Sequence, residues 1–231
     1  MIIYGKQVCL YALQHHPERI KHVYLQKKHQ LSKQLFRAFE HSLSWIDARK
    51  AQAMSRGGNH QGILVDIEEI EPVGLSELKQ GSFLVVLDHV TDVGNIGAIV
   101  RTAYALGADG VVVCGMRRLN MPAVVRTSTG ALLDMPVAVI PNVADVLHEL
   151  SQVGFVRYGA SMEGDPVETV TFASKRVLIL GSEGDGLSTK ALEKTDRFVA
   201  IRMKRPFDSL NVSAAAAILL HRMSYAVERI A

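Results

Sequence analysis

The sequence is poor in cysteine and has no long hydrophobic run. Its 231 residues include only Cys9 and Cys114, far apart and at the ends of unrelated apolar runs. This excludes a disulfide scaffold and predicts reduced, buried thiols in a cytosolic protein. No apolar run reaches the roughly 18 residues that suggest a membrane span. The first residues, MIIYGKQVCLY, lack the apolar core and cleavage site of a signal peptide. We therefore expect a cytoplasmic protein with no membrane partner.

Several chemical signatures are also missing. No Cys/His cluster has the spacing of a zinc site, so we expect no metal. The glycine-rich stretch GSEGDG is not a P-loop, because no Gly-Lys-Ser/Thr follows it. A nicotinamide-dependent dehydrogenase needs GxGxxG after the first strand of a βαβ unit and an acidic residue about 20 positions later. The sequence lacks this arrangement, which weighs against that class of enzyme.

Acidic residues are scarce in the first part of the chain. Residues 1–60 contain ten Lys/Arg against three Asp/Glu, and six of the nine histidines. Residues 71–231 are nearly balanced, with sixteen Lys/Arg against seventeen Asp/Glu. A basic N-terminal part on a near-neutral body predicts a polyanionic partner, with RNA or DNA as the leading candidates. An ordinary solvated surface is the alternative.

Apolar runs are plentiful, and they alternate with helical patterns. Hydrophobic residues make up 48% of the chain, enough for a sizeable core. Runs rich in Val, Ile and Leu predict strands at residues 83–88, 110–115, 136–140, 154–160, 176–181 and 198–203. Helical segments are expected at about 96–106, 143–152, 188–195 and 209–230. This alternation predicts an α/β fold with a mostly parallel sheet.

The chain also divides into parts of different composition. The stretch DIEEIEPVGLSELKQGS, residues 66–82, is acidic, contains Pro and Gly, and is typical of a linker. Upstream we expect a helix within 5–16, a strand at 20–26, a helix within 31–42 capped by Ser32, and a strand near 63–67. No catalytic constellation occurs there, which favours a binding module. The expected division is residues 1–70, a linker at 71–81, and residues 82–231.

Polar residues follow three of the predicted strands, where ligands of parallel α/β sheets bind. Asn95 lies near a helix start, where Asn is a favoured cap, and Arg101 follows six residues later. An arginine there could hold a phosphate, although a surface arginine is an equal alternative. The glycines of GSEGDG, residues 181–186, allow close approach of the backbone to a ligand, and a tight turn is the alternative.

The third polar stretch, RPFDSLNVS, occupies residues 205–213. Ser209 or Asp208 can cap a helix that starts around Leu210. Asn211 and Ser213 would then lie inside the first turn, where helix propensity favours neither. One cap suffices for a helix, so the additional polar residues indicate a binding or catalytic site.

Together these segments resemble the three motifs of the SpoU (TrmH-like) family of RNA ribose 2′-O-methyltransferases, within the SPOUT superfamily. The segments are GNIGAIVRTA, LILGSEGDGL and SLNVSAAAA. They occur in the family's order, and the resemblance covers residues 82–230. YGKQVCLYAL and HQGILVDI resemble the opening and closing stretches of the family's substrate-binding domain, which is similar to ribosomal protein L30e. The resemblance is closest to the branch that methylates a guanosine ribose in 23S ribosomal RNA. A transfer-RNA target, and a catalytically dispensable rRNA-binding assembly factor, are alternatives.

The resemblance implies a fold, a cofactor and a set of site residues. The fold is a mostly parallel sheet with a deep C-terminal trefoil knot, preceded by a small L30e-like α/β domain. S-adenosylmethionine would bind within the knot, and two chains would form a homodimer through the catalytic domain. The implied catalytic residues are Asn95, Arg101, Glu183, Ser209 and Asn211. The implied cofactor-binding residues are Gly130, Gly181, Ile201, Met203 and Leu210.

The resemblance gives Arg101 the central role. A guanidinium scarcely deprotonates in proteins, so we expect Arg101 to bind the adjacent phosphate and orient the hydroxyl rather than act as a base. Glu183 would position Arg101 through a charge-assisted hydrogen bond. The sequence departs from the family pattern at two places. Val93 stands where Pro is usual, and residues 201–205 are Ile-Arg-Met-Lys-Arg where Ile-Pro-Met, a small residue and Gly are usual. The added charges suit an RNA substrate.

Overall fold

The computed structural model describes residues 1–27, 30–206 and 209–227, which belong to two compact units. The smaller unit comprises Met1–Glu71 together with Asn120–Asp134. The larger unit comprises Pro72–Leu119 and the chain from Met135 onward. The expected division into residues 1–70, 71–81 and 82–231 stays a prediction. Contacts within the structure group Asn120–Asp134 with Met1–Glu71.

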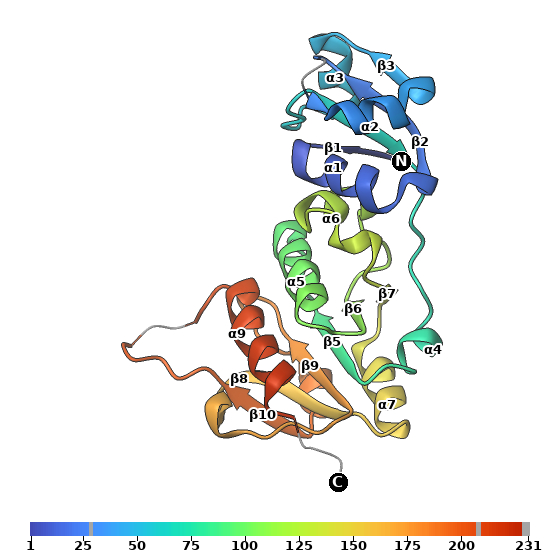
Figure 1. The fold of residues 1–231 in the computed structure, drawn as a ribbon. Coiled ribbons are helices and arrows are strands. Elements are labelled where there is room, and N and C mark those ends of the chain that lie inside the picture. The colour runs from blue at the N-terminus through green and yellow to red at the C-terminus, as the bar shows by residue number, and fades with distance from the viewer. Residues whose placement is uncertain (28–29, 207–208, 228–231) are drawn as a thin grey trace. The chain divides into compact units, whose positions relative to one another are not determined.

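The smaller unit is built on a four-stranded sheet in the order β1-β4-β2-β3 (Figure 1). The strands are β1 (Ile2–Tyr4), β2 (Ile20–Leu25), β3 (Leu43–Trp45) and β4 (Ile63–Ile67). β4 runs antiparallel to β1 and β2, whereas β2 and β3 are parallel. Its helices are α1 (Lys6–His15), α2 (Lys33–Ala38), α3 (Ala48–Met54) and α6 (Met121–Thr127), with short 3-10 turns at Pro17–Arg19, Glu40–Ser42 and Ala131–Leu133. The likeness of this unit to L30e stays a prediction.

Local signals explain several of these elements. Ser32 caps α2 as expected, because its hydroxyl accepts a hydrogen bond from Leu35 N at 3.3 Å. Helices α3 and α6 and strands β1 and β3 were not anticipated from the sequence. α6 carries a recognisable start signal, because Asn120 Oδ1 accepts from Ala123 N at 3.3 Å and Pro122 lies in the first turn.

The larger unit contains a six-stranded sheet in the order β10-β8-β9-β5-β6-β7, and every pair is parallel. The strands are β5 (Phe83–Asp88), β6 (Gly110–Cys114), β7 (Val137–Ile140), β8 (Val156–Pro166), β9 (Arg176–Leu180) and β10 (Arg197–Ala200). β5 is buried along its whole length, which explains its uninterrupted FLVVLD sequence. The predicted α/β fold with a mostly parallel sheet is confirmed, whereas the knot stays a prediction.

Helices cover both faces of this sheet. They are α4 (Leu75–Leu78), α5 (Val93–Ala105), α7 (Val143–Gln152), α8 (Thr189–Leu192) and α9 (Val212–Tyr225), with a 3-10 turn at Val167–Thr169. α7 and α8 pack on the face that carries Leu84 and Val86. Val85 and Leu87 alternate to the opposite face, where α5 and α9 lie side by side (Figure 1). Both sheet faces are therefore shielded from water.

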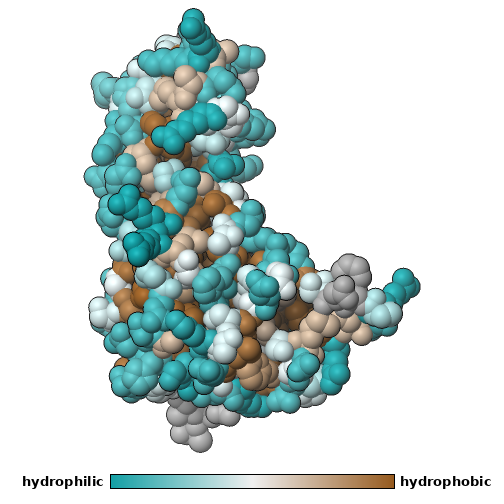
Figure 2. Space-filling model, turned by 180° about the vertical axis from the view of Figure 1, so that it is seen from behind, coloured by the Kyte–Doolittle hydropathy of each residue, from teal (hydrophilic) through white to brown (hydrophobic). Residues whose placement is uncertain are grey.

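The face of the molecule seen in Figure 2 is predominantly polar. On the face seen in Figure 2, hydrophilic side chains cover most of the molecule and hydrophobic surface is limited to patches. In the described part of the chain, none of the helices has the combination of length and apolar character needed to cross a bilayer.

Candidate active site

The glycine-rich segment after β9 forms a tight loop at the carboxyl edge of the sheet. Ser182 and Gly186 exchange two backbone hydrogen bonds, with N···O distances of 3.0 and 3.1 Å. Gly186 has a φ of 69°, a conformation that glycine adopts without strain. A Cβ at Gly181 would lie 2.1 Å from the carbonyl carbon and oxygen of Gly186. The loop therefore requires glycine at Gly181 because its two arms meet there.

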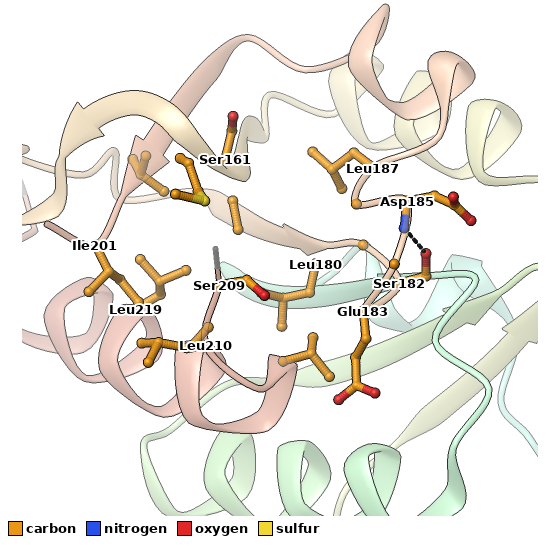
Figure 3. A pocket seen from close by; sticks show the side chains of 18 of the residues that line it. Ser161, Leu180, Ser182, Glu183, Asp185, Leu187, Ile201, Ser209, Leu210 and Leu219 are labelled. Carbon is orange, nitrogen blue, oxygen red and sulfur yellow. Dashed lines mark hydrogen bonds between the residues drawn. The ribbon is translucent and has the colours of Figure 1, made fainter. Parts of the chain in front are cut away.

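This loop forms one wall of a cavity of about 560 Å³. Figure 3 shows Ser182, Glu183 and Asp185 on one side, Ile201, Leu210 and Leu219 on the other, and Leu180 between them. The lining also includes Ala160, Ser161 and Met162 of β8, together with Met203 and Ser209 from the segment that leads into α9. The cavity thus combines an apolar floor with polar groups on its rim, as small-molecule sites usually do.

Three residues from the three motifs are joined by hydrogen bonds beside this cavity. Asn95 Nδ2 donates to Glu183 Oε1 at 2.9 Å. Asn211 Nδ2 donates to the same oxygen at 2.7 Å and to Asn95 Oδ1 at 3.1 Å. Glu183 comes from the glycine-rich loop, Asn95 from the first turn of α5 and Asn211 from the start of α9. We call Asn95, Glu183 and Asn211 the polar triad. Its members lie 28 to 116 positions apart in sequence.

Asn211 has a second role that corrects the expected start of the last helix. α9 begins at Val212, and Asn211 is its cap, with Oδ1 accepting from Ser213 N at 3.0 Å and Ala214 N at 3.3 Å. Ser209, expected as a cap, instead lines the cavity. Asp208, the other expected cap, and the helical positions expected at 228–230 lie outside the described residues. α9 therefore starts two residues later than the expected start around Leu210, because its cap is Asn211.

Asn95, unlike Asn211, is not a helix cap. Asp92 caps α5, since its Oδ1 accepts from Asn95 N at 2.8 Å. The Asn95 side chain is consequently available to the polar triad. Val93, which stands where the family pattern has Pro, is the first residue of α5 and tolerates this position without a break in the helix.

The other expected site residues are distributed differently. Gly181, Ile201, Met203, Ser209 and Leu210 all line the cavity. Among its described lining residues, neither Arg101 nor Gly130 appears. Arg101 is exposed on α5, about 120° around the helix axis from Asn95 and about 9 Å along it. Gly130 is buried in the smaller unit, where a Cβ would lie 2.6 Å from the Tyr11 ring. Their roles in binding stay predictions.

The segment 201–206 alternates between the cavity and solvent. Ile201 and Met203 line the cavity, whereas Arg202, Lys204 and Arg205 are exposed. The departures from the family pattern therefore lie on the outer side of the segment, so they add positive charge beside the cavity without filling it.

A buried carboxylate, not anticipated from the sequence, supports the same edge of the sheet. Asp88, at the end of β5, accepts from Ser188 N at 2.7 Å and from His89 Nδ1 at 2.7 Å. Burial, with a smaller contribution from the Asp88 charge, raises the pKa of the Cys114 thiol to about 12. Through its hydrogen bond from Ser188 N, Asp88 ties the end of β5 to the residue that caps α8. Its position at a strand end was the available signal.

The described residues contain no group of three or more His, Cys, Asp or Glu side chains that could hold a metal ion. The candidate site consists of the half-apolar cavity, the glycine-rich loop that forms one of its walls, and the polar triad.

Comparisons with known proteins identify the family. Residues 82–221 match the model of the SpoU rRNA Methylase family, and residues 2–73 match a model described as RNA 2'-O ribose methyltransferase substrate binding. The crystal structure of the SpoU methyltransferase AviRb from Streptomyces viridochromogenes in complex with AdoMet is similar, with a TM-score of 0.77 and 26% identity. The superposition covers 97% of this chain and 89% of that one.

Sequence relatives extend the same likeness. The chain is 29% identical over 232 residues to the 23S rRNA (guanosine-2'-O-)-methyltransferase RlmB of Bordetella pertussis, with 95% of each protein covered. It is 33% identical over 188 residues to an uncharacterized tRNA/rRNA methyltransferase of Mycolicibacterium gilvum, covering 78% of this chain and 60% of that relative. The chain thus spans less than two thirds of the latter protein's length. Because the family model extends from β5 into α9, over more than half of the residues, this protein belongs to the SpoU rRNA methylase family.

Proposed function

We propose that this chain transfers a methyl group from S-adenosylmethionine to a ribose 2′-hydroxyl of RNA, with a guanosine of 23S ribosomal RNA as the favoured target. The polar triad beside the glycine-walled cavity carries this proposal, because it joins all three family motifs at one place. The likeness to RlmB over 95% of both proteins supports ribosomal RNA over transfer RNA.

The cavity fits the proposed cofactor. Its volume of about 560 Å³ lies within the range of small-molecule sites. Gly181 offers main-chain groups on one side of the cavity, and Ile201, Met203 and Leu210 offer apolar contact and main-chain groups on the opposite side. These are the residues that would hold S-adenosylmethionine. When bound, the cofactor supplies an electrophilic methyl group on a sulfonium. We propose Gly130 as a further contact.

The chain's own residues would position the hydroxyl. The Glu183 carboxylate fixes the amides of Asn95 and Asn211, so that both side chains keep one orientation. The Ser209 hydroxyl lies on the cavity wall and can hydrogen-bond the ribose (Figure 3). Arg101 would bind the phosphate beside the target ribose and orient the hydroxyl. Guanidinium groups scarcely deprotonate in proteins, so we assign the hydroxyl proton to solvent.

We also propose that two chains associate through α5 and α9. Tyr104 on α5 is 44% exposed, and Ile218 and Tyr225 on α9 are 40% and 74% exposed. Large apolar side chains exposed on two adjacent helices favour a protein partner over solvent. A second copy of this chain accounts for that surface and agrees with the homodimer that the family resemblance implies.

Replacement of Arg101 tests the assignment of the catalytic role. We expect Arg101→Ala to lower methyl incorporation into ribosomal RNA at least 100-fold, because the phosphate and hydroxyl lose their anchor. Tritiated S-adenosylmethionine measures incorporation, and calorimetry should find cofactor affinity within about threefold of wild type. Arg197→Ala is the matched control, since it removes an exposed arginine of β10 in a weak surface ion pair. Full activity of Arg101→Ala would refute the role.

The substrate is tested by mapping ribose methylation across total cellular RNA with and without the protein. We expect one methylated guanosine of 23S ribosomal RNA to disappear when the protein is absent and to return with wild type but not with Arg101→Ala. A change confined to transfer RNA would overturn the ribosomal assignment. Return of a missing growth function with the inactive variant would favour an assembly factor.

A further inference from the structure

The chain's only tryptophan lies at the surface of the smaller unit. Trp45 is the last residue of β3, which is an edge strand, and the residue is 48% exposed. Phe36 of α2 lies against it, with ring centroids 6.1 Å apart and an angle of 28° between the ring planes. One side of the indole is thus supported by Phe36, and nearly half of its surface remains accessible to solvent.

Positive charge surrounds this aromatic pair. Lys33 and Arg37 are exposed on α2, about 60° and 100° around the helix from Phe36. Lys27 is exposed two residues beyond Leu25, the residue that pairs with Trp45 across the sheet. Within the described residues none of these three cations forms an ion pair. Glu40 and Asp47 are the two acidic residues between positions 20 and 60, against eight Lys/Arg. The aromatic surface therefore lies in a local excess of positive charge.

An exposed indole with cations beside it matches the chemistry of an unpaired nucleotide. A base stacks on the aromatic face, and the flanking phosphates contact lysine and arginine. An apolar protein partner would gain nothing from the unpaired cations, and a duplex would hide its base faces from the indole. Charge and aromaticity together favour single-stranded nucleic acid over both.

We propose that Phe36 and Trp45, flanked by Lys33 and Arg37, form a stacking platform that holds one unpaired base of the RNA substrate outside the catalytic unit. This inference rests on the proposed RNA substrate. It assigns a specific contact to the smaller unit, whose residues 2–73 match a substrate-binding model.

Because Trp45 is the only tryptophan, its fluorescence reports on this surface directly in the full-length protein. We expect an unstructured oligoadenylate of ten nucleotides to quench the emission. An abasic ribose-phosphate oligomer of the same length should bind through its phosphates but leave the emission nearly unchanged. Equal quenching by both oligomers would overturn the platform, because it would show that no base contacts the indole.

Variants separate stacking from charge. We expect Trp45→Leu to weaken oligoadenylate binding about tenfold and Trp45→Phe to stay within about threefold, measured by anisotropy of labelled RNA. The double variant Lys33→Gln, Arg37→Gln should lower the slope of log affinity against log salt by about 1.4. Arg49→Gln, Lys50→Gln on α3 is the matched control for net charge. Equal losses in the two double variants, or equal affinities of the Leu and Phe variants, would overturn the proposal.

Methyl transfer distinguishes this inference from the proposed function. If Trp45→Leu methylates ribosomal RNA with an unchanged KM, the platform is wrong while the enzymatic function stands. If the wild type methylates no RNA yet shows base-dependent quenching, the function is wrong while the platform stands. Should Trp45→Leu unfold, as judged by circular dichroism, the two oligomers and the phenylalanine variant still decide the question.

Discussion

Asn211 serves structure and site with the two ends of one amide. Its oxygen caps α9, and its nitrogen donates to Glu183 and Asn95. A hydroxyl can replace the cap oxygen, but it cannot reproduce two amide donors. The two roles can therefore be separated by the choice of substitution.

We expect Asn211→Ser to keep the free energy of unfolding near that of wild type while methyl transfer falls at least tenfold. Asn211→Ala should lose the same activity and also about 1 kcal/mol of stability, because the first turn of α9 loses its cap. Urea unfolding and a tritiated-methyl assay measure the two quantities. If the serine variant keeps most of the wild-type activity, the amide donors are not needed and Asn211 serves only as the cap of α9.

Because the Cys114 thiol is buried, we expect the free energy of unfolding to fall at high pH. Its thiol pKa is raised from 9.0 to about 12 by burial, so the folded state keeps a proton that the unfolded chain releases. The contribution of this thiol to the free energy of unfolding is fully present below about pH 9. It falls by about 1.4 kcal/mol per pH unit as pH rises toward 12. Urea unfolding between pH 8 and 10.5 should show a smaller decline for Cys114→Ala than for wild type. Parallel curves would contradict this account.

Individual site residues were predictable to the extent that each follows a strand. The sequence placed Asn95, Glu183 and Asn211 after strands of one parallel sheet, and the structure joins them by hydrogen bonds. It could not choose which of several polar residues caps a helix. Asp92 and Asn211 are the caps, because each carries an acceptor two or three residues before the first unpaired N–H groups. That choice depends on side-chain rotamers that the pattern does not encode.

At the scale of elements, the buried strands were the most predictable features. β5 and α7 agree with the expected ranges because an uninterrupted apolar run and a regular helical stripe have one interpretation each. The short elements α3, α6 and β3 were missed, since three to seven residues give too few repeats of a period. The packing of Asn120–Asp134 with the smaller unit was also missed, because sequence distance carries no sign of it.

We expect RNA binding to depend on the positive charge of the segment before α9. Arg202, Lys204 and Arg205 are exposed beside the cavity, whereas Ile201 and Met203 line it. Changing the three cations to Gln should raise the KM for RNA and lower the slope of log affinity against log salt by about 2. Cofactor affinity should change less than threefold, because the lining residues are kept.

The control for that experiment keeps the charge and changes the shape. Arg202→Lys combined with Arg205→Lys should retain the salt dependence of wild type. A loss of RNA affinity in this control as large as in the neutral variant would assign the effect to the shape of the segment rather than to its charge.

At the scale of the whole molecule, the division of labour between the units is better tested by point variants than by truncation. Tyr11 Oη donates to Asp134 Oδ2 at 2.6 Å, and Arg19 Nη1 donates to Leu133 O at 3.5 Å. Removal of residues 1–70 would delete these partners and uncover the apolar residues of Asn120–Asp134. A fall in RNA affinity after truncation would then combine lost contacts with misfolding.

Association of two chains would cover the apolar face of α5 and α9. We expect Ile218→Glu to convert a dimer into a monomer, because it introduces a charge where a partner would exclude water. Sedimentation velocity at micromolar concentration measures the change. Val153→Glu is the matched control, since Val153 is 38% exposed at the end of α7, away from that face. A monomeric wild type, or equal effects of the two variants, would contradict the proposed interface.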